Sequence, residues 1–263
     1  MKNNKFDCLF FTNCGKVRRE NQDAVLLRQI ETNHGDVVFA VVADGMGGTE
    51  NGHQASNILI DSLTSWWDEN LEKLGEEDLS AEILEQSLRV RIEQVNKEIT
   101  ELKEKSGTTM SLLFLWNNQY LILHAGDSRI YFLRDIGIDQ ITRDETWYEQ
   151  ELEKGTLNQH DVPLKKMKSV LVNAIGVKKD YKLSKAYGSL ENIYCGVLCS
   201  DGAYHYIESD DLEEILKPVR DINIKKAEFS KILQNSEATD NYSMIIIQKK
   251  KSWCNIGNFW RRD

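Results

Sequence analysis

The sequence contains no long hydrophobic run. None of its 263 residues lies in a stretch that approaches the roughly 18 apolar residues of a membrane-spanning helix. The N-terminal segment MKNNKFDCLFFTNC has no apolar core of the length that a signal peptide needs. We therefore expect a cytoplasmic protein without a transmembrane segment.

The sequence also has little proline and no net positive charge. The two prolines, Pro163 and Pro218, mark no linker, and the 41% apolar fraction is ordinary, so we expect one folded domain. The formal net charge of −9 argues against a nucleic-acid surface, because such binding depends on phosphate neutralisation by Lys and Arg. Local binding of one phosphate group remains compatible with this charge, and so does a metal site built from carboxylates.

Several familiar site patterns are missing. The 5 cysteines include no CxxC pair, so neither a disulfide framework nor a zinc site is indicated, and Cys195 and Cys199 are expected to be core thiols. The 5 histidines show no HExxH or HxH spacing. No GxxxxGK(S/T), HRD, DFG or GxSxG element is present, which excludes P-loop, kinase and serine-hydrolase interpretations.

The apolar pattern predicts a mixed α+β domain. Eight strands are expected near 7–11, 23–29, 36–43, 110–116, 119–125, 129–133, 193–199 and 242–248. Helices are expected near 53–72, 80–104, 144–154, 210–217 and 225–234. The first two helices should pair antiparallel over a sheet, with Ser80 as the N-cap of the second. A hairpin at Asn117 and Asn118 followed closely by 129–133 predicts a meander.

Four aspartates lie where apolar runs meet turns: Asp23, Asp44, Asp201 and Asp240. A carboxylate at a strand end is rigidly held yet open to solvent, which suits a catalytic divalent cation. An Asp-Gly pair alone predicts a plain turn more readily than a site, but four such positions favour a metal site. Mg²⁺ and Mn²⁺ take oxygen ligands and need no histidine.

Two such ions about 3.5–4 Å apart can activate a water for in-line attack on phosphorus, with no covalent enzyme intermediate. A guanidinium would hold the phosphoryl oxygens in bidentate fashion, and Arg18 and Arg19 both lie close enough to Asp23 to do so.

Eight motifs occur in an order that resembles the metal-dependent protein phosphatases, the PPM or type 2C family, and most of all its compact bacterial serine/threonine phosphatases. They are GKVRRENQD, VVADGMGG, SGTTMSLL, AGDSRIYFLR, ITRDET, LVNAIG, LCSDGA and TDNYSMIII. The resemblance spans about residues 8–248. It implies a four-layer αββα sandwich, with two antiparallel sheets flanked by antiparallel helix pairs, over 1–248, and leaves 249–263 as a basic, aromatic C-terminal tail.

The resemblance also implies a dinuclear Mn²⁺ or Mg²⁺ site. Asp44 would bridge the two ions, Gly45 would offer its carbonyl to one, and Asp201 and Asp240 would hold the other. Asp23 would act through a water bound to metal.

The remaining site residues are also assigned by the resemblance. The phosphate-binding arginine lies five residues before the first aspartate, which selects Arg18 over Arg19. Asp127 would help to hold a third, weaker ion together with Asp201; the alternative is a strand-end carboxylate that binds local backbone. Supporting roles fall to Thr108, Thr109 and Asn241.

This chain departs from the family pattern at three places near the site, one of which is SEATDN, where the glycine that often precedes the last Asp-Asn is missing. Met46 stands where some members have a histidine proposed as the general acid, so the donor to the leaving alkoxide stays unassigned. Gln22 replaces the acidic residue that many members place before Asp23, which could weaken metal binding modestly.

Residues 143–180 correspond to the family's flap beside the active site. The segment is polar and lysine-rich around LKKMKS, and we expect it to contact the phosphoprotein; a solvated surface loop is the alternative for any single lysine. The tail 249–263 is expected to be a mobile terminus, with docking to an acidic partner or an anionic membrane as the alternative.

The predicted function is therefore hydrolysis of phosphoserine and phosphothreonine in proteins, by a monomer that opposes a serine/threonine kinase. Two rival hypotheses keep the same fold. A pseudophosphatase would bind phosphoproteins without hydrolysing them, and a small-molecule phosphatase would act on metabolite esters.

Overall fold

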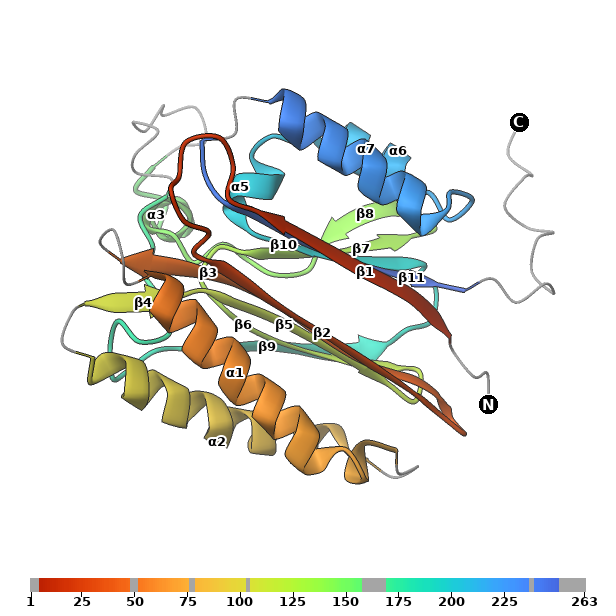
Figure 1. Ribbon diagram of the computed structural model, residues 1–263, viewed down its shortest axis with the longest axis horizontal. Helices are drawn as coiled ribbons and strands as arrows, with labels where there is room; N and C mark the ends of the chain where they lie inside the picture. Colours follow the sequence, from red (N-terminus) through yellow and green to blue (C-terminus); the bar gives the residue numbers. More distant parts are fainter. Residues whose placement is uncertain are drawn as a thin grey trace.

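The structure is a computed structural model that describes residues 5–47, 52–75, 79–102, 105–157, 169–236 and 239–250. Two β-sheets pack face to face, and helices cover the outer face of each (Figure 1). The predicted αββα sandwich is confirmed.

The first sheet has the strand order β2-β3-β5-β6-β9, with every neighbouring pair antiparallel. Its strands are β2 (Asp23–Thr32), β3 (Gly35–Gly47), β5 (Met110–Trp116), β6 (Gln119–Ala125) and β9 (Ser184–Ser189), and the short β4 (Ser106–Thr108) pairs with the end of β3. Along β3, Phe39 and Val41 face the helices, whereas Val38 and Ala40 face the second sheet. Burial on both faces explains why this strand is a continuous apolar run.

The second sheet has the order β1-β11-β10-β7-β8 and is also antiparallel. Its strands are β1 (Phe6–Asn13), β7 (Arg129–Arg134), β8 (Gly137–Gln140), β10 (Cys195–Cys199) and β11 (Tyr242–Lys249). Leu198, Ile245 and Ile247 pack against the first sheet, and Cys195 and Cys199 are buried towards the helices, as expected for core thiols.

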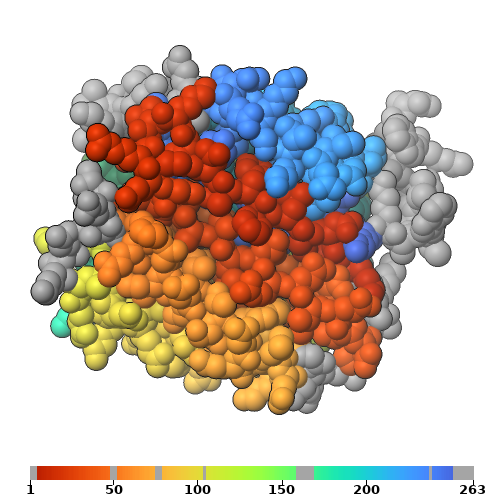
Figure 2. Space-filling model, in the orientation of Figure 1, coloured from red at the N-terminus to blue at the C-terminus, as the bar shows by residue number. Residues whose placement is uncertain are grey.

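Two helix groups cover the sheets, one on each side. Over the first sheet lie α1 (Gly52–Asn70), the short 3₁₀ helix Lys73–Gly75 and α2 (Ala81–Thr100); over the second lie α6 (Ser209–Leu216) and α7 (Ile222–Asn235). The Ser80 hydroxyl accepts a hydrogen bond from the amide of Ile83 at 3.2 Å, so the predicted N-cap is confirmed. In the space-filling view the N-terminal strands form a red band between the blue α6–α7 region and the orange α1 (Figure 2).

The predicted meander is wrong. Asn117 and Asn118 have φ values of +42° and +61° and close the β5–β6 hairpin as expected, because such turns need left-handed residues. After β6, however, the chain crosses to the other sheet at Gly126, whose φ is +112°, and β7 pairs with β10.

Five short elements were not predicted from the apolar pattern: β4, β8, β9, the 3₁₀ helix Lys73–Gly75 and the one-turn helix α5 (Asp201–Tyr204). The predicted helix 144–154 is the shorter α3 (Trp147–Glu153). Lys249 belongs to β11, and residues 251–263 of the predicted tail lie outside the described residues. Within the described ranges, no helix combines the length and apolar character needed to cross a membrane.

Candidate active site

The four aspartates meet at one end of the sandwich. Asp23 begins β2 and faces Asp44 of β3 in the antiparallel register. Asp201 opens α5 directly after β10, and Asp240 stands two residues before β11. The pKa of Asp44 is raised well above its ordinary value, first by burial and then by the charges of the other three and of Asp127. Five carboxylates from separate segments are therefore close enough to repel one another.

Two threonines hold the backbone of Asp44. The amide of Asp44 donates to Thr109 Oγ1 at 2.9 Å, and its carbonyl accepts from the Thr109 amide at 2.9 Å and from Thr108 Oγ1 at 3.2 Å. Both threonines are buried. The two threonines thus fix the backbone from which the Asp44 side chain extends, and their role in the working site stays a prediction.

Asp23 is buried, and only one of its two carboxylate oxygens has a hydrogen-bond partner among the described residues. Its Oδ2 accepts from Ser200 Oγ at 2.7 Å, whereas Oδ1 has no hydrogen-bond partner among the described residues. Burial raises the pKa of Asp23 to about 7, against the hydrogen bonds of Ser200 and Ser243 that lower it. An unpartnered buried carboxylate oxygen is costly, so this atom suits a water or a cation.

Asp127 and Asp201 lie next to neighbouring strands at the same end of the second sheet, since Asp127 precedes β7, Asp201 follows β10, and Arg129 pairs with Cys199. Burial raises the pKa of Asp127 to about 8, and the charges of Asp201 and Asp144 add to the shift. Burial also raises the pKa of Asp201, while nearby His205, whose Nδ1 lies 3.9 Å from Asp201 Oδ2, lowers it.

Arg18 lies beside the carboxylates and pairs with one of them. Its Nη2 lies 2.7 Å from Asp240 Oδ2, and both side chains are partly exposed. The pKa of Arg18 is raised by this hydrogen bond, and the charges of Asp44 and Asp201 contribute as well. The guanidinium is therefore placed where a phosphoryl group near the aspartates could reach it.

Asn241 closes the loop that carries Arg18. Its Oδ1 accepts from the amide of Gln22 at 2.9 Å, and its Nδ2 donates to the carbonyls of Cys14 at 2.8 Å and Glu20 at 2.9 Å. Residues 14 to 22 are thus fixed to the start of β11. The supporting role of Asn241 in the working site stays a prediction.

Gly45 occupies a position where no side chain fits. Its amide donates to the carbonyl of Gln22 at 3.1 Å, and a Cβ would lie 2.2 Å from the carbonyl oxygen of Gly52. Glycine is therefore required for the close approach of α1 to the end of β3.

Sequence reasoning missed several neighbours of the cluster. Arg129 binds Asp144 with its Nη2 at 2.7 Å, and its guanidinium lies 3.7 Å from the centre of the Tyr204 ring. Ser200 and His205 were also not singled out. Arg129 and Asp144 stand within the motifs AGDSRIYFLR and ITRDET, so their position was visible but their pairing was not.

The donor set suits hard divalent cations, since it is built from carboxylate oxygens without thiolate or clustered imidazole. Across the part of the chain that the structure describes, no three or more His, Cys, Asp or Glu side chains are already arranged to hold a metal ion. The raised pKa values and the unpartnered oxygen of Asp23 nevertheless identify the cluster as a place where positive charge would be stabilising.

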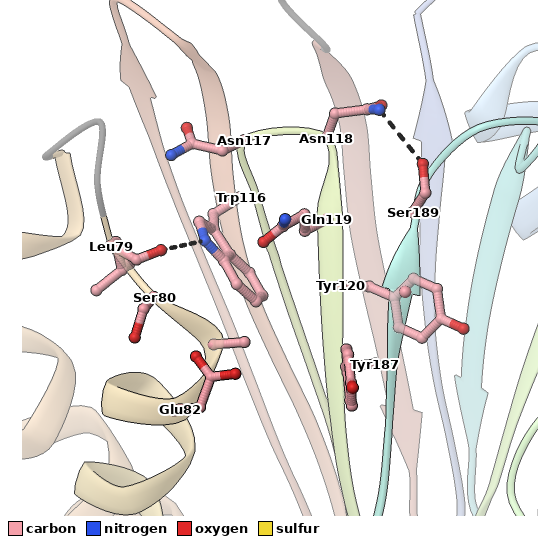
Figure 3. Close-up of a pocket in the computed structure, with 12 residues that line it drawn as sticks. Leu79, Ser80, Glu82, Trp116, Asn117, Asn118, Gln119, Tyr120, Tyr187 and Ser189 are labelled. Carbon is pink, nitrogen blue, oxygen red and sulfur yellow. Dashed lines mark hydrogen bonds between the residues drawn. The ribbon is translucent and has the colours of Figure 1, made fainter.

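A separate hollow of about 620 Å³ lies at the far end of the first sheet. Trp116, Asn118 and Ser189 line it together with Glu82 of α2 and Tyr187 of β9 (Figure 3). None of the aspartates of the cluster lines this hollow, so it offers no pocket for the chemistry they would perform.

The arrangement of sheets and helices is that of known bacterial phosphatase structures. The serine/threonine phosphatase Stp1 from Staphylococcus aureus superposes with a TM-score of 0.80 at 23% identity, over 94% of this chain and 96% of that one. The serine/threonine phosphatase PstP/Ppp of Mycobacterium tuberculosis gives 0.77 at 21% identity, over 94% and 99%. These comparisons define the fold class.

The family follows from the sequence. A family model described as Protein phosphatase 2C matches residues 14–234, and the chain belongs to this metal-dependent family. The serine/threonine phosphatase stp of Listeria monocytogenes is 28% identical over 246 residues, 91% of this chain and 94% of its own length. The protein phosphatase PhpP of Streptococcus pneumoniae is 26% identical over 238 residues, 90% and 94%. The predicted family and enzyme class, a serine/threonine protein phosphatase, are confirmed.

Proposed function

We propose that this chain hydrolyses phosphoserine and phosphothreonine in proteins at the aspartate cluster, with two Mn²⁺ or Mg²⁺ ions and no covalent intermediate. The observation that carries the proposal is the convergence of Asp23, Asp44, Asp201 and Asp240 at one end of the sandwich, next to the guanidinium of Arg18, which lies 2.7 Å from Asp240 Oδ2. Asp44, Gly45, Asp201 and Asp240 would hold the two ions, and Asp127 a third, weaker one. Ions bound there would lower the pKa of a water and polarise the phosphoryl group.

The side chains of the cluster supply binding and orientation. Arg18 would bind two phosphoryl oxygens with its planar guanidinium, which its ion pair with Asp240 keeps next to the carboxylates. Asp23 would accept a hydrogen bond from a water at Oδ1, since Ser200 holds Oδ2. Thr109 holds the backbone of Asp44, and Asn241 holds the loop of residues 14 to 22 that carries Arg18. The flap would contact the protein part of the substrate.

Incubation of the purified protein with Mn²⁺ and a phosphothreonine peptide tests the proposal. Asp201→Asn should abolish metal-dependent phosphate release while the circular dichroism spectrum stays unchanged, because one carboxylate of the metal site is lost. Asp61→Asn, on an exposed face of α1, is the matched control and should keep full activity.

Other outcomes would favour the rival hypotheses. Near-normal turnover in Asp201→Asn would contradict the two-metal mechanism. Peptide binding without phosphate release would favour a pseudophosphatase. Much faster turnover of metabolite phosphates than of phosphopeptides would favour a small-molecule phosphatase.

A further inference from the structure

Glu145 binds three separate segments next to the candidate active site. It lies near the start of the flap and is partly buried. Its Oε2 accepts from the Gly126 amide at 2.9 Å and from the side-chain amide of Asn173, and its Oε1 accepts from Ser184 Oγ at 2.7 Å. Its backbone amide donates to the Gly126 carbonyl at 2.8 Å, and its carbonyl accepts from the Val172 amide at 2.9 Å.

The first of these segments is the turn that carries Asp127. Glu145 holds both the amide and the carbonyl of Gly126, and His124 Nε2 also lies 3.0 Å from that carbonyl. Gly126 packs closely on Thr109, since a Cβ on this glycine would lie 2.7 Å from the Thr109 Cβ. Thr109 Oγ1 in turn accepts a hydrogen bond from the backbone amide of Asp44. A continuous set of contacts therefore joins Glu145 to the carboxylates.

The second segment is the far end of the flap. The Trp147 amide donates to the Val170 carbonyl at 2.7 Å, and Thr146 forms a β-bridge with Leu171. Asn173 accepts from the Lys182 amide at 2.9 Å and donates to the Lys182 carbonyl at 2.8 Å. The two ends of the flap thus meet at Glu145, and the contact with Ser184 fixes them to β9.

The partners of the Glu145 carboxylate named above are all neutral donors: a backbone amide, a side-chain amide and a hydroxyl. Hydrogen bonds to an ionised acceptor are stronger than neutral ones and are directional. The carboxylate therefore fixes geometry among these segments instead of neutralising a cation.

We propose that Glu145 is a positioning residue, which holds the Asp127 turn to the two described ends of the flap, 143–157 and 169–180, so that the turn and these ends keep one relative position. The inference rests on the proposed function, because it takes Asp127 as part of the working site. Glu145 itself contacts neither the aspartates nor, on this proposal, the substrate; it acts through Gly126.

Glu145→Gln tests the proposal at nearly constant volume. The neutral carboxamide accepts hydrogen bonds more weakly than the carboxylate, so the bonds from the Gly126 amide and from Asn173 lose strength even where the Ser184 hydroxyl turns round and accepts from the new NH₂ group. In the metal-free protein, amide hydrogen exchange at Gly126 and Val172 should become faster. With Mn²⁺, kcat for p-nitrophenyl phosphate should fall by about 10-fold to 100-fold, as is usual when an outer support of a metal site is lost, while KM changes by less than about twofold.

Glu153→Gln is the matched control. It makes the same chemical change within α3, where Glu153 pairs with the exposed Arg143, and both exchange and kcat should stay at wild-type values. If Glu145→Gln does not fold, Asn173→Ala provides the second test, because it leaves the bond between Glu145 and Gly126 intact. It should speed exchange at Lys182 and Val172 but not at Gly126.

Two results for folded Glu145→Gln would overturn the proposal: slow exchange at Gly126, as in the wild type, or faster exchange with unchanged kcat. If the wild-type protein releases no phosphate, the proposed function fails, and the exchange measurements still decide whether Glu145 holds the turn.

Discussion

Arg18 and Asp240 form an ion pair in which each residue has a second proposed task. The guanidinium would bind phosphate and the carboxylate would bind metal, yet they lie 2.7 Å apart. Their partial exposure keeps the pair weak, because exposed ion pairs contribute little to stability. Arg18 can therefore turn towards a phosphoryl group at small cost.

Replacement of Arg18 should affect substrate binding more than turnover. In Arg18→Ala we expect KM for a phosphopeptide to rise by about 10-fold and kcat to fall less, because the lost contacts are made in the ground state as well as in the transition state. Steady-state kinetics with Mn²⁺ measures both constants. Arg19→Ala is the control, and an effect confined to Arg19 would contradict the assignment.

The order of the motifs in the sequence was enough to single out aspartates that the fold brings to one end of the sandwich, but their local partners were not predictable. Ser200 binds Asp23 across 177 positions of sequence, and Asn241 binds carbonyls near the start of the chain. Such contacts depend on how two strands are aligned, which residue types alone do not specify. The roles assigned to the individual aspartates remain predictions.

The helix pair over the second sheet has an unusual buried lysine. Lys225 of α7 has no exposed surface, and its Nζ donates to the carbonyl of Leu216 at 2.7 Å, at the C-terminal end of α6. A helix C-terminus leaves carbonyls without partners and attracts positive charge. Lys225 thus joins the end of one helix to the face of the next.

Truncation of this side chain should destabilise the protein. In Lys225→Ala we expect a loss of about 2–4 kcal/mol in the free energy of unfolding, since a cavity forms and a buried carbonyl loses its donor. Urea denaturation measures the change, and the exposed neighbour variant Lys226→Ala should remain within about 0.5 kcal/mol of the wild type. An equally stable Lys225→Ala would show that Leu216 finds another partner.

The elements that sequence analysis predicted are the ones with strong apolar patterns. β3, β5 and β11 are buried almost throughout, and their length leaves little ambiguity. In contrast, β9 reads SKAYGS and is mostly exposed, so no alternation marks it as a strand. The meander failed because the glycine in AGDS signals a turn without showing which sheet receives the next strand.

At the scale of the whole molecule, the carboxylate cluster should make stability depend on pH. The pKa is raised to about 7 for Asp23 and to about 8 for Asp127, above the ordinary value of 3.8. Between pH 3.8 and these raised pKa values, each folded-state carboxyl keeps a proton that the unfolded chain has released. The free energy of unfolding therefore falls as the pH rises through this window. Bound cations would offset the burial of these carboxylates and the repulsion between them, which together cause the loss.

The metal-free protein should therefore melt at a lower temperature at about pH 8.5 than at about pH 5.5, and Mn²⁺ should raise the melting temperature more at the higher pH. Scanning calorimetry checks both differences. Asp23→Asn removes one of the titrating groups and should reduce the pH dependence, whereas Asp61→Asn should leave it unchanged. A metal-free protein that melts at the same temperature at both pH values would contradict this interpretation.

The pairing of the first strand with the last has a consequence for the order of events during synthesis. In the described sheet β1 pairs with β11 alone, and β11 is also the strand that links β1 to β10. A nascent chain that has not yet released residues 240–249 from the ribosome therefore lacks Asp240, Asn241 and the strand that completes the second sheet. The second sheet and the full set of carboxylates can therefore come together only after residues 240–249 have left the ribosome.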